Sequence, residues 1–293
     1  MVDTTGQSNL RAEYVDKSVK AVALMEYKLR NLCTIDSSSA YTETYFRETN
    51  TDLTGGGVAS PTRVKGVPRL SPLPYGEVSY TKVSGINEKY AMEGMIAYED
   101  EIMDYLPLIE RTLLRIGRGV AKAVDDQIAT VMLASAGQSV AISAGNEWDS
   151  ATVANRDPIK NILDAIQKLR AQNIDALNGN GYLVVNGTDY TNLISNSKIM
   201  NNPTFKSADV VSNGVVGELL GLKIMVTQAL EVTVPDVAYV VVAKSAMVWK
   251  QVQALTVEQI RDPGIKTTIR AFEIGHCQMV TPNAVCKITN TRA

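Results

Sequence analysis

A long amphipathic repeat in residues 104–134 constrains the fold more than any other feature of the sequence. Its apolar side chains recur at steps of three and four, which is the spacing of one face of an α-helix. About thirty helical residues span ~45 Å, so the sequence predicts one very long helix. The apolar stripe consists of Leu106, Ile109, Leu113, Ile116, Val120, Val124, Ile128 and Val131.

Four residues indicate where this helix begins and where its middle is interrupted. Asp104 is the expected N-cap, and Pro107 then falls in the first turn, where a missing N–H has no cost. Gly117 and Gly119 interrupt the middle of the repeat. No strand precedes them, so they do not form a phosphate loop, and we expect them to allow a bend or a close backbone contact.

A second amphipathic helix is expected over residues 9–32, capped by Ser8 or Asn9. Its stripe must be buried either on its own body or on another chain, and the sequence leaves both open. The stripe consists of Val15, Val19, Val22, Met25, Leu29 and Leu32.

Residues 41–92 are too polar to build a core of their own. Only 18 of these 52 residues are apolar, and six glycines and four prolines exclude a helix. Strand-like segments, 41–48 and 77–83, lie on either side of the Gly/Pro-rich centre. The pattern predicts a long β-hairpin arm that contacts a partner, and a disordered insertion is the alternative.

The remaining sequence alternates helices and strands. Asp157 and Pro158 have the types expected at an N-cap and the first helical position, and a helical repeat follows them. We predict an α+β body with mixed strands. Further expected elements are strands at 182–185, 220–226, 237–243, 252–260, 267–274 and 284–288 and a helix near 188–197.

Composition argues against most catalytic functions. The net charge is -2, so a globally basic nucleic-acid binder is excluded. One histidine, His276, leaves no site that needs two imidazoles, and Cys277 and Cys286 add at most two further metal ligands. The three cysteines do not form a disulfide scaffold, and no apolar run approaches the ~20 residues of a membrane span. We therefore predict no enzyme activity, no cofactor, no metal and no membrane partner.

A basic stripe is the one candidate binding feature. Arg111, Arg115, Arg118 and Lys122 follow one another at steps of four, three and four. They form either a solvated helix face with local ion pairs or a surface that attracts phosphate groups.

The order of these parts resembles the major capsid proteins of tailed double-stranded DNA phages, whose fold encapsulins share. Three segments carry the resemblance. The first resembles the lead-in and the spine helix, the second the axial domain, and the third the closing strands of that family. They are 95–104 with the helix ending at 123–128, 181–193 with 218–226, and 257–271 with 280–285.

The resemblance implies a capsid fold with four parts: an N-terminal arm, an extended β-hairpin loop, a peripheral domain with the spine helix, and an axial α/β domain. These would comprise residues 1–40, residues 41–92, residues 93–150 with 249–275, and residues 151–248 with 276–293.

The same resemblance implies a shell of pentamers and hexamers around viral double-stranded DNA, in a virion assembled in the host cytoplasm. Portal, decoration and separate scaffolding proteins would be its partners. The spine helix would face inward, which favours DNA contact by Arg111, Arg115, Arg118 and Lys122. An encapsulin-like compartment around a cargo enzyme is the alternative.

Some members of the family join subunits covalently. The resemblance therefore makes Lys65 in the loop and Asn283 or Asn290 near the C-terminus candidate cross-link partners.

Overall fold

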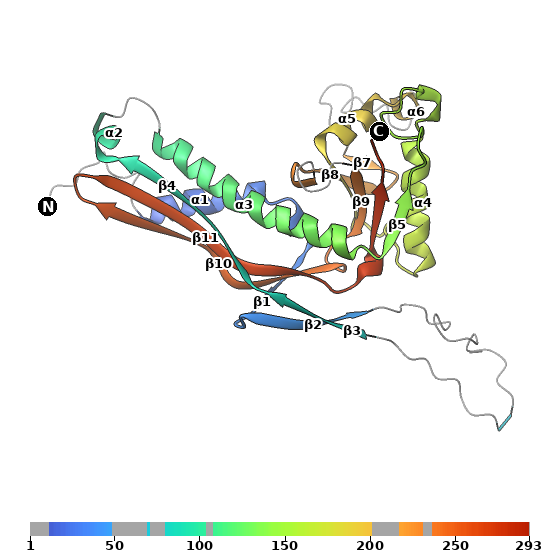
Figure 1. The fold of residues 1–293 in the computed structure, drawn as a ribbon, viewed down its shortest axis with the longest axis horizontal. Coiled ribbons are helices and arrows are strands. Elements are labelled where there is room, and N and C mark those ends of the chain that lie inside the picture. The colour runs from blue at the N-terminus through green and yellow to red at the C-terminus, as the bar shows by residue number, and fades with distance from the viewer. Residues whose placement is uncertain are drawn as a thin grey trace.

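Two sheets and a separate hairpin organise the chain. The computed structural model describes residues 12–48, 69–70, 80–103, 108–200, 217–230 and 236–292. A four-stranded sheet has the order β1-β10-β11-β4, and a six-stranded sheet has the order β5-β12-β9-β6-β8-β7. Strands β2 and β3 form the hairpin. Figure 1 shows the first sheet and helix α3 as an elongated half, beside a more compact half built on the second sheet.

The four-stranded sheet is a long antiparallel ribbon with two additional strands. Strand β10 (Met247–Asp262) pairs with β11 (Lys266–Met279) over almost its whole length, and Gly264 takes a positive φ in the turn between them. Strand β4 (Glu88–Ala97) pairs antiparallel with β11, and β1 (Thr34–Ser37) pairs parallel with β10. β10 and β11 extend beyond the strands expected at 252–260 and 267–274, because pairing continues through Met247–Gln251 and Gly275–Met279.

Helix α3 (Leu108–Ser135) lies along this sheet (Figure 1) and confirms the predicted long helix. Its first described residue is Leu108, so the expected roles of Asp104 and Pro107 fall outside the described residues. The apolar stripe packs against β4 and β11 and against the N-terminal helix. Of the predicted stripe, Leu113, Ile116, Val120, Val124 and Ile128 are buried and Val131 is partly buried. Ala121, Ala129 and Met132, which the stripe did not include, are buried beside them.

The two glycines of α3 allow close contacts, as expected. A Cβ atom on Gly117 would lie 3.1 Å from the carbonyl oxygen of Val19 in the N-terminal helix. A Cβ atom on Gly119 would lie 2.1 Å from the Sδ atom of Met92 in β4. The missing side chains therefore let one helix and one strand approach α3 on different sides.

The N-terminal helix is shorter than expected. Helix α1 (Ala12–Glu26) ends six residues before the predicted limit, and a 3₁₀ helix, η2 (Leu29–Leu32), follows it. The candidate caps Ser8 and Asn9 lie outside the described residues. Buried Val15, Val19 and Ala23 pack against α3 of the same chain. The apolar stripe is therefore covered by its own body.

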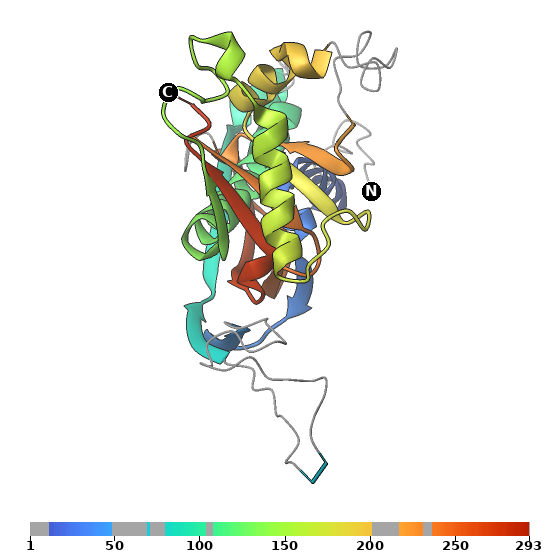
Figure 2. The same cartoon turned by 90° about the vertical axis from the view of Figure 1, so that its right-hand side faces the viewer.

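The second half is an α/β unit with mixed pairing, as predicted. β5 runs parallel to β12, β6 runs parallel to β8, and β9 runs antiparallel to β6 and to β12. Helix α4 crosses one face of this sheet in Figure 2. The elements are β5 (Gln138–Ala141), α4 (Pro158–Ala171), β6 (Gly181–Val185), α5 (Gly187–Ser195), α6 (Ser197–Met200), β7 (Glu218–Leu219), β8 (Leu222–Val226), β9 (Val237–Val242) and β12 (Val285–Thr289), with 3₁₀ helices η3 (Val153–Asn155) and η4 (Pro282–Ala284).

Local signals explain two details of this unit. Asp157 caps α4 by accepting a hydrogen bond from the backbone N–H of Lys160 at 3.3 Å, as its sequence position predicts. The strand expected at 220–226 is interrupted, because Leu220 and Gly221 both take positive φ values of 55° and 79°. These two residues instead form the turn between β7 and β8.

The hairpin pairs β2 (Thr42–Glu48) with β3 (Tyr80–Ile86) in antiparallel register. The expected strands at 41–48 and 77–83 agree with it in the described residues, and the predicted tip lies outside them. The hairpin forms a separate two-stranded ribbon beneath the four-stranded sheet in Figure 1. A short helix, α2 (Tyr98–Met103), follows β4 at the far end of the ribbon.

Candidate functional site

The basic stripe lies on one exposed face of α3. Arg111, Arg115, Arg118 and Lys122 all have exposed side chains. Their spacing places them in one narrow sector of the helix, opposite the buried stripe. The structure therefore brings all four predicted residues onto a single surface.

Charge along this stripe is uneven. Arg118 Nε forms an ion pair with Glu26 Oε1 of α1 at 2.8 Å. Lys122 lowers the pKa of Asp126, although burial has the larger effect and the net shift of that pKa is upward. Arg111 and Arg115 form no ion pair with another residue of the described ranges. The N-terminal half of the stripe therefore has the least compensated positive charge.

Asp125, beside this stripe, anchors the segment after α1. Its carboxylate accepts hydrogen bonds from the backbone N–H groups of Lys28 at 2.8 Å and Arg30 at 3.1 Å. These are the free donors at the start of η2, so Asp125 caps that helix from a distant element. Burial raises the pKa of Asp125 to about 6, and the hydrogen bonds oppose part of this rise.

A buried ion pair fixes the same segment to the ribbon. Arg30 Nη2 lies 3.1 Å from Oε1 of Glu273, a fully buried residue of β11. Tyr27 donates its hydroxyl to Glu273 Oε2 at 2.6 Å, and Trp249 donates Nε1–H to Oε1 at 3.0 Å. Burial, followed by the charge of Glu273, raises the pKa of Tyr27 well above its ordinary value. This polar cluster joins η2 and Tyr27, the residue after α1, to β10 and β11.

Sequence reasoning missed this cluster. Glu273 shares the buried face of its strand with Ile269 and Ala271, and that alternation was the available signal. Asp125 sits one position after Val124 of the apolar stripe, which also indicated burial. Their partners, Arg30 and Tyr27, are distant in sequence and are found only from the fold.

The residues considered for chemistry do not gather at one site: His276 and Cys277 are consecutive in β11 and alternate between the two faces of the strand. His276 is half-buried on β11, and burial lowers its pKa. Cys277 is fully buried, and a hydrogen bond with Cys33 together with burial raises the pKa of its thiol. Burial raises the pKa of Cys286 to about 11. The described part of the chain contains no group of three or more His, Cys, Asp or Glu residues that could hold a metal ion.

The cross-link candidates are held by local hydrogen bonds. Asn283 accepts a hydrogen bond from Gln138 at 3.1 Å. Asn290 is exposed, takes a positive φ of 61° and donates to the Ile142 carbonyl at 3.2 Å. Lys65 lies outside the described residues, so the pairing stays a prediction.

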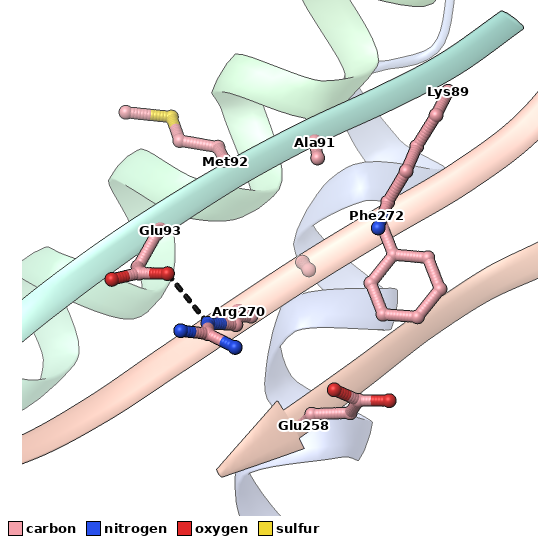
Figure 3. Close-up of a pocket in the computed structure, with 8 residues that line it drawn as sticks. Lys89, Ala91, Met92, Glu93, Glu258, Arg270 and Phe272 are labelled. Atoms are coloured by element: carbon pink, nitrogen blue, oxygen red, sulfur yellow. Dashed lines mark hydrogen bonds and ion pairs between the residues drawn. The ribbon is translucent and has the colours of Figure 1, made fainter. Parts of the chain in front are cut away.

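A shallow pocket of about 450 Å³ lies on the ribbon (Figure 3). Arg270 of β11 binds Glu93 of β4 at 2.5 Å, and Lys89 lies 4.2 Å from the centre of the Phe272 ring. Glu258 of β10 completes the charged lining. Two of its charged groups, Arg270 and Glu93, are thus paired across neighbouring strands.

A family comparison decides how these surfaces are interpreted. A model of the phage capsid protein family matches residues 89–288, which is more than half of the chain. The chain belongs to this family. The predicted resemblance is therefore confirmed, and the chain is a structural capsid protein.

Solved capsid structures share the fold of this capsid protein. The capsid of cyanophage P-SCSP1u matches with a TM-score of 0.66 and 15% identity, covering 90% of this chain and 88% of that one. Mycobacterium phage Che8 matches with a TM-score of 0.64 and 21% identity, covering 90% and 92%. The virus-like particle from Pyrococcus furiosus matches with a TM-score of 0.60 and 11% identity, covering 94% and 98%. The α+β capsid fold is therefore confirmed.

No curated protein matches the sequence. Among the helices of the described residues, none is both long and apolar enough to cross a membrane.

Proposed function

We propose that this capsid protein is the major subunit of an icosahedral shell, in which its pentamers and hexamers enclose viral double-stranded DNA. It acts as a structural subunit without catalytic activity or a cofactor. Its membership of the phage capsid family supports this function. The observation that carries it is the hairpin, whose large apolar side chains are uncovered in a single copy and require a neighbour. These are Tyr41, Phe46, Tyr80 and Ile86, which are 77%, 60%, 62% and 50% exposed.

In this proposal the chain divides into the four parts expected from its sequence. Residues 1–40 are the arm, residues 41–92 the extended loop, residues 93–150 with 249–275 the peripheral domain, and residues 151–248 with 276–293 the axial domain. Secondary structure crosses three of these limits, since β4 begins at Glu88, β10 begins at Met247 and β11 continues to Met279.

The basic stripe is the proposed DNA-facing surface. Exposure of Arg111, Arg115, Arg118 and Lys122 on one helix face supports contact with phosphates that does not depend on base sequence. A near-neutral chain with one local basic stripe suits a wall that touches DNA only along that line.

Scaffolding, portal and decoration proteins are the remaining proposed partners, and the virion, assembled in the host cytoplasm, is the proposed location.

Electron microscopy of the expressed chain, with a scaffolding protein where one is required, tests the proposal. We expect capsomers and closed shells. A chain that stays monomeric under all assembly conditions would contradict it.

An encapsulin-like compartment around a cargo enzyme is the second candidate. The match to the Pyrococcus furiosus virus-like particle favours keeping it. Purified particles distinguish the two: nuclease-protected double-stranded DNA supports the phage shell, and a co-purifying enzyme supports the compartment.

We also keep the covalent hypothesis for Lys65 with Asn283 or Asn290. The lysine amine would attack the asparagine side-chain carbonyl, forming an amide bond and releasing ammonia. A boiled denaturing gel of mature particles tests this, because ladders of linked subunits are expected and monomer alone would refute it.

A further inference from the structure

The β2–β3 hairpin rests on the body mainly through polar contacts. Gln278 donates to Glu43 Oε2 at 3.2 Å. Arg47 donates to Ser135 Oγ at 2.9 Å and to the Met279 carbonyl at 3.4 Å. Phe46, Tyr80 and Ile86 of the hairpin are exposed and only Tyr45 and Val83 are half-buried, so buried apolar area makes a limited contribution to its orientation. A small number of polar groups therefore sets the angle between hairpin and body.

The only histidine of the chain lies directly beneath β3. A Cβ atom on Gly85 would lie 2.4 Å from Nε2 and 2.5 Å from Cδ2 of His276. The backbone of β3 thus lies against the imidazole ring, in a contact that only glycine permits. A movement of this ring therefore displaces the strand.

Gln127 of α3 holds the other side of the ring. Its Nε2 lies 3.1 Å from His276 Nδ1, and its Oε1 is buried without a hydrogen-bond partner among the described residues. In this arrangement the amide donates to an unprotonated Nδ1. A charged ring has a proton on Nδ1, and a half-turn of the amide would present Oε1 to accept it. The pair therefore has one hydrogen-bonded arrangement for each charge state.

Charged groups from several elements surround this ring. Glu43 of β2 and Glu88 of β4 favour its protonated form, although burial is the larger influence and lowers the pKa of His276. Lys250 of β10 is opposite His276 in the strand register and lies 4.0 Å from Glu43. On α3, Asp126 precedes Gln127. β3 directs no charged side chain toward the body. The pKa of His276 therefore lies below the ordinary value for histidine, which favours the neutral ring near pH 7.

We propose that His276 and Gln127 form a proton-dependent pivot that sets the angle of the β2–β3 hairpin. The neutral ring supports the observed orientation. The charged ring attracts Glu43 away from Gln278 and Lys250, and the hairpin then tilts relative to α3.

Pulsed electron spin resonance on the unassembled full-length chain tests the pivot. Spin labels are placed on Thr44→Cys, on the exposed face of the hairpin, and Thr130→Cys, on the exposed face of α3. The native cysteines are buried, and the chain without these substitutions controls for their labelling. From about pH 8 to about pH 5, we expect the distance distribution to shift with one midpoint below about 6.5.

Two variants assign the transition. His276→Gln should abolish the shift, which separates His276 from Asp125, since Asp125 titrates in the same range. Glu88→Gln preserves the ring and should lower the midpoint by several tenths of a pH unit. A distribution that does not change in the parent chain, a shift that persists in His276→Gln, or an unchanged midpoint in Glu88→Gln would each overturn the proposal. If circular dichroism shows that His276→Gln does not fold, the Glu88→Gln midpoint decides alone.

Discussion

Individual buried carboxylates hold the N-terminal segment on the body in two different ways. Asp125 receives only backbone N–H groups, so no opposite charge balances its burial. Glu273 has a cationic partner in Arg30 and further donors in Tyr27 and Trp249. Asp125 should therefore make the stability of the chain depend on pH. Glu273 should make it depend on an intact ion pair with Arg30.

Asp125 should make the chain more stable at mildly acidic pH than at neutral pH. Its folded-state pKa of about 6 exceeds the ordinary value of 3.8, so its stabilising contribution is complete below 3.8 and is lost as pH rises through 6. Between about pH 5 and pH 7 this group should reduce the free energy of unfolding by about 1 kcal/mol. Asp125→Asn, which mimics the protonated carboxyl, should remove that part of the slope in urea titrations. An identical slope in both chains would contradict the assignment.

Glu273 should be costly to change alone. Glu273→Gln leaves the Arg30 guanidinium buried without its counter-ion, and we expect a loss of about 3–5 kcal/mol in the free energy of unfolding. The double variant Arg30→Met with Glu273→Gln removes the charge and keeps one acceptor oxygen, in place of the two that accept from Tyr27 and Trp249. It should recover part of the loss in the same urea titration. A double variant less stable than Glu273→Gln would show that the unpaired charge is not the cause.

At the scale of elements, helix α3 supports both α1 and the four-stranded sheet. It meets α1 on one side and β4 and β11 on another, and its remaining face presents the basic stripe. Its glycines and its exposed cations therefore make predictions of different kinds.

Alanine at the two glycines of α3 should have opposite effects. At Gly117 the added Cβ meets the backbone carbonyl of Val19 at 3.1 Å, so α1 must shift and stability should fall by about 1–2 kcal/mol. At Gly119 it meets the flexible end of Met92, which can move, and the gain in helix propensity is up to about 1 kcal/mol. Thermal unfolding of the two variants measures which one is more stable. If Gly117→Ala is more stable than Gly119→Ala, these contacts do not explain why glycine occupies the two positions.

The basic stripe should bind duplex DNA in a salt-dependent way. Replacing Arg111 and Arg115 by Gln removes the two cations of the stripe that form no ion pair within the described ranges, and the slope of log affinity against log salt should fall by about 2. Fluorescence anisotropy over a salt series measures this slope. Lys160→Gln with Arg170→Gln, on the exposed face of α4, is the matched control and should leave it unchanged. If the slope falls equally in both variants, DNA binding depends on the overall positive charge of the chain and not on a DNA-facing stripe.

At the scale of the whole molecule, the body and the hairpin are stabilised by different means. The body has a continuous apolar core across both halves, from Val15 of α1 to Ile288 of β12. The hairpin lies outside that core and is attached through polar contacts. Loss of the loop should therefore affect assembly and leave folding intact.

Deletion of residues 51–74 tests this separation. The body should keep its circular dichroism spectrum and unfold within a few degrees of the full chain, because none of its described core residues is removed. Closed shells should be absent by electron microscopy. Normal shells from the deleted chain would show that the loop does not link subunits.

Local patterns were sufficient for most elements. The apolar repeat predicted α3, and the Asp157–Pro158 pair predicted the start of α4. Alternation predicted β8 and β12, and a continuous apolar run predicted β9, apart from their limits. They were wrong about the end of α1 and about the strand at 220–226. In both cases the backbone turns, near Tyr27 and at Leu220–Gly221, where side-chain periodicity alone does not indicate it.

The candidate site divides in the same way. The stripe on α3 follows from spacing along one helix, so the sequence by itself placed Arg111, Arg115, Arg118 and Lys122 on one face. The sequence also determined that 41–92 cannot form a core. Only the tertiary structure decided that α1 packs on its own α3, that Asp125 and Glu273 hold that segment, and that His276 lies beneath Gly85. The physical reason is that these contacts join residues far apart in the chain, whose pairing depends on how the sheets and α3 pack together.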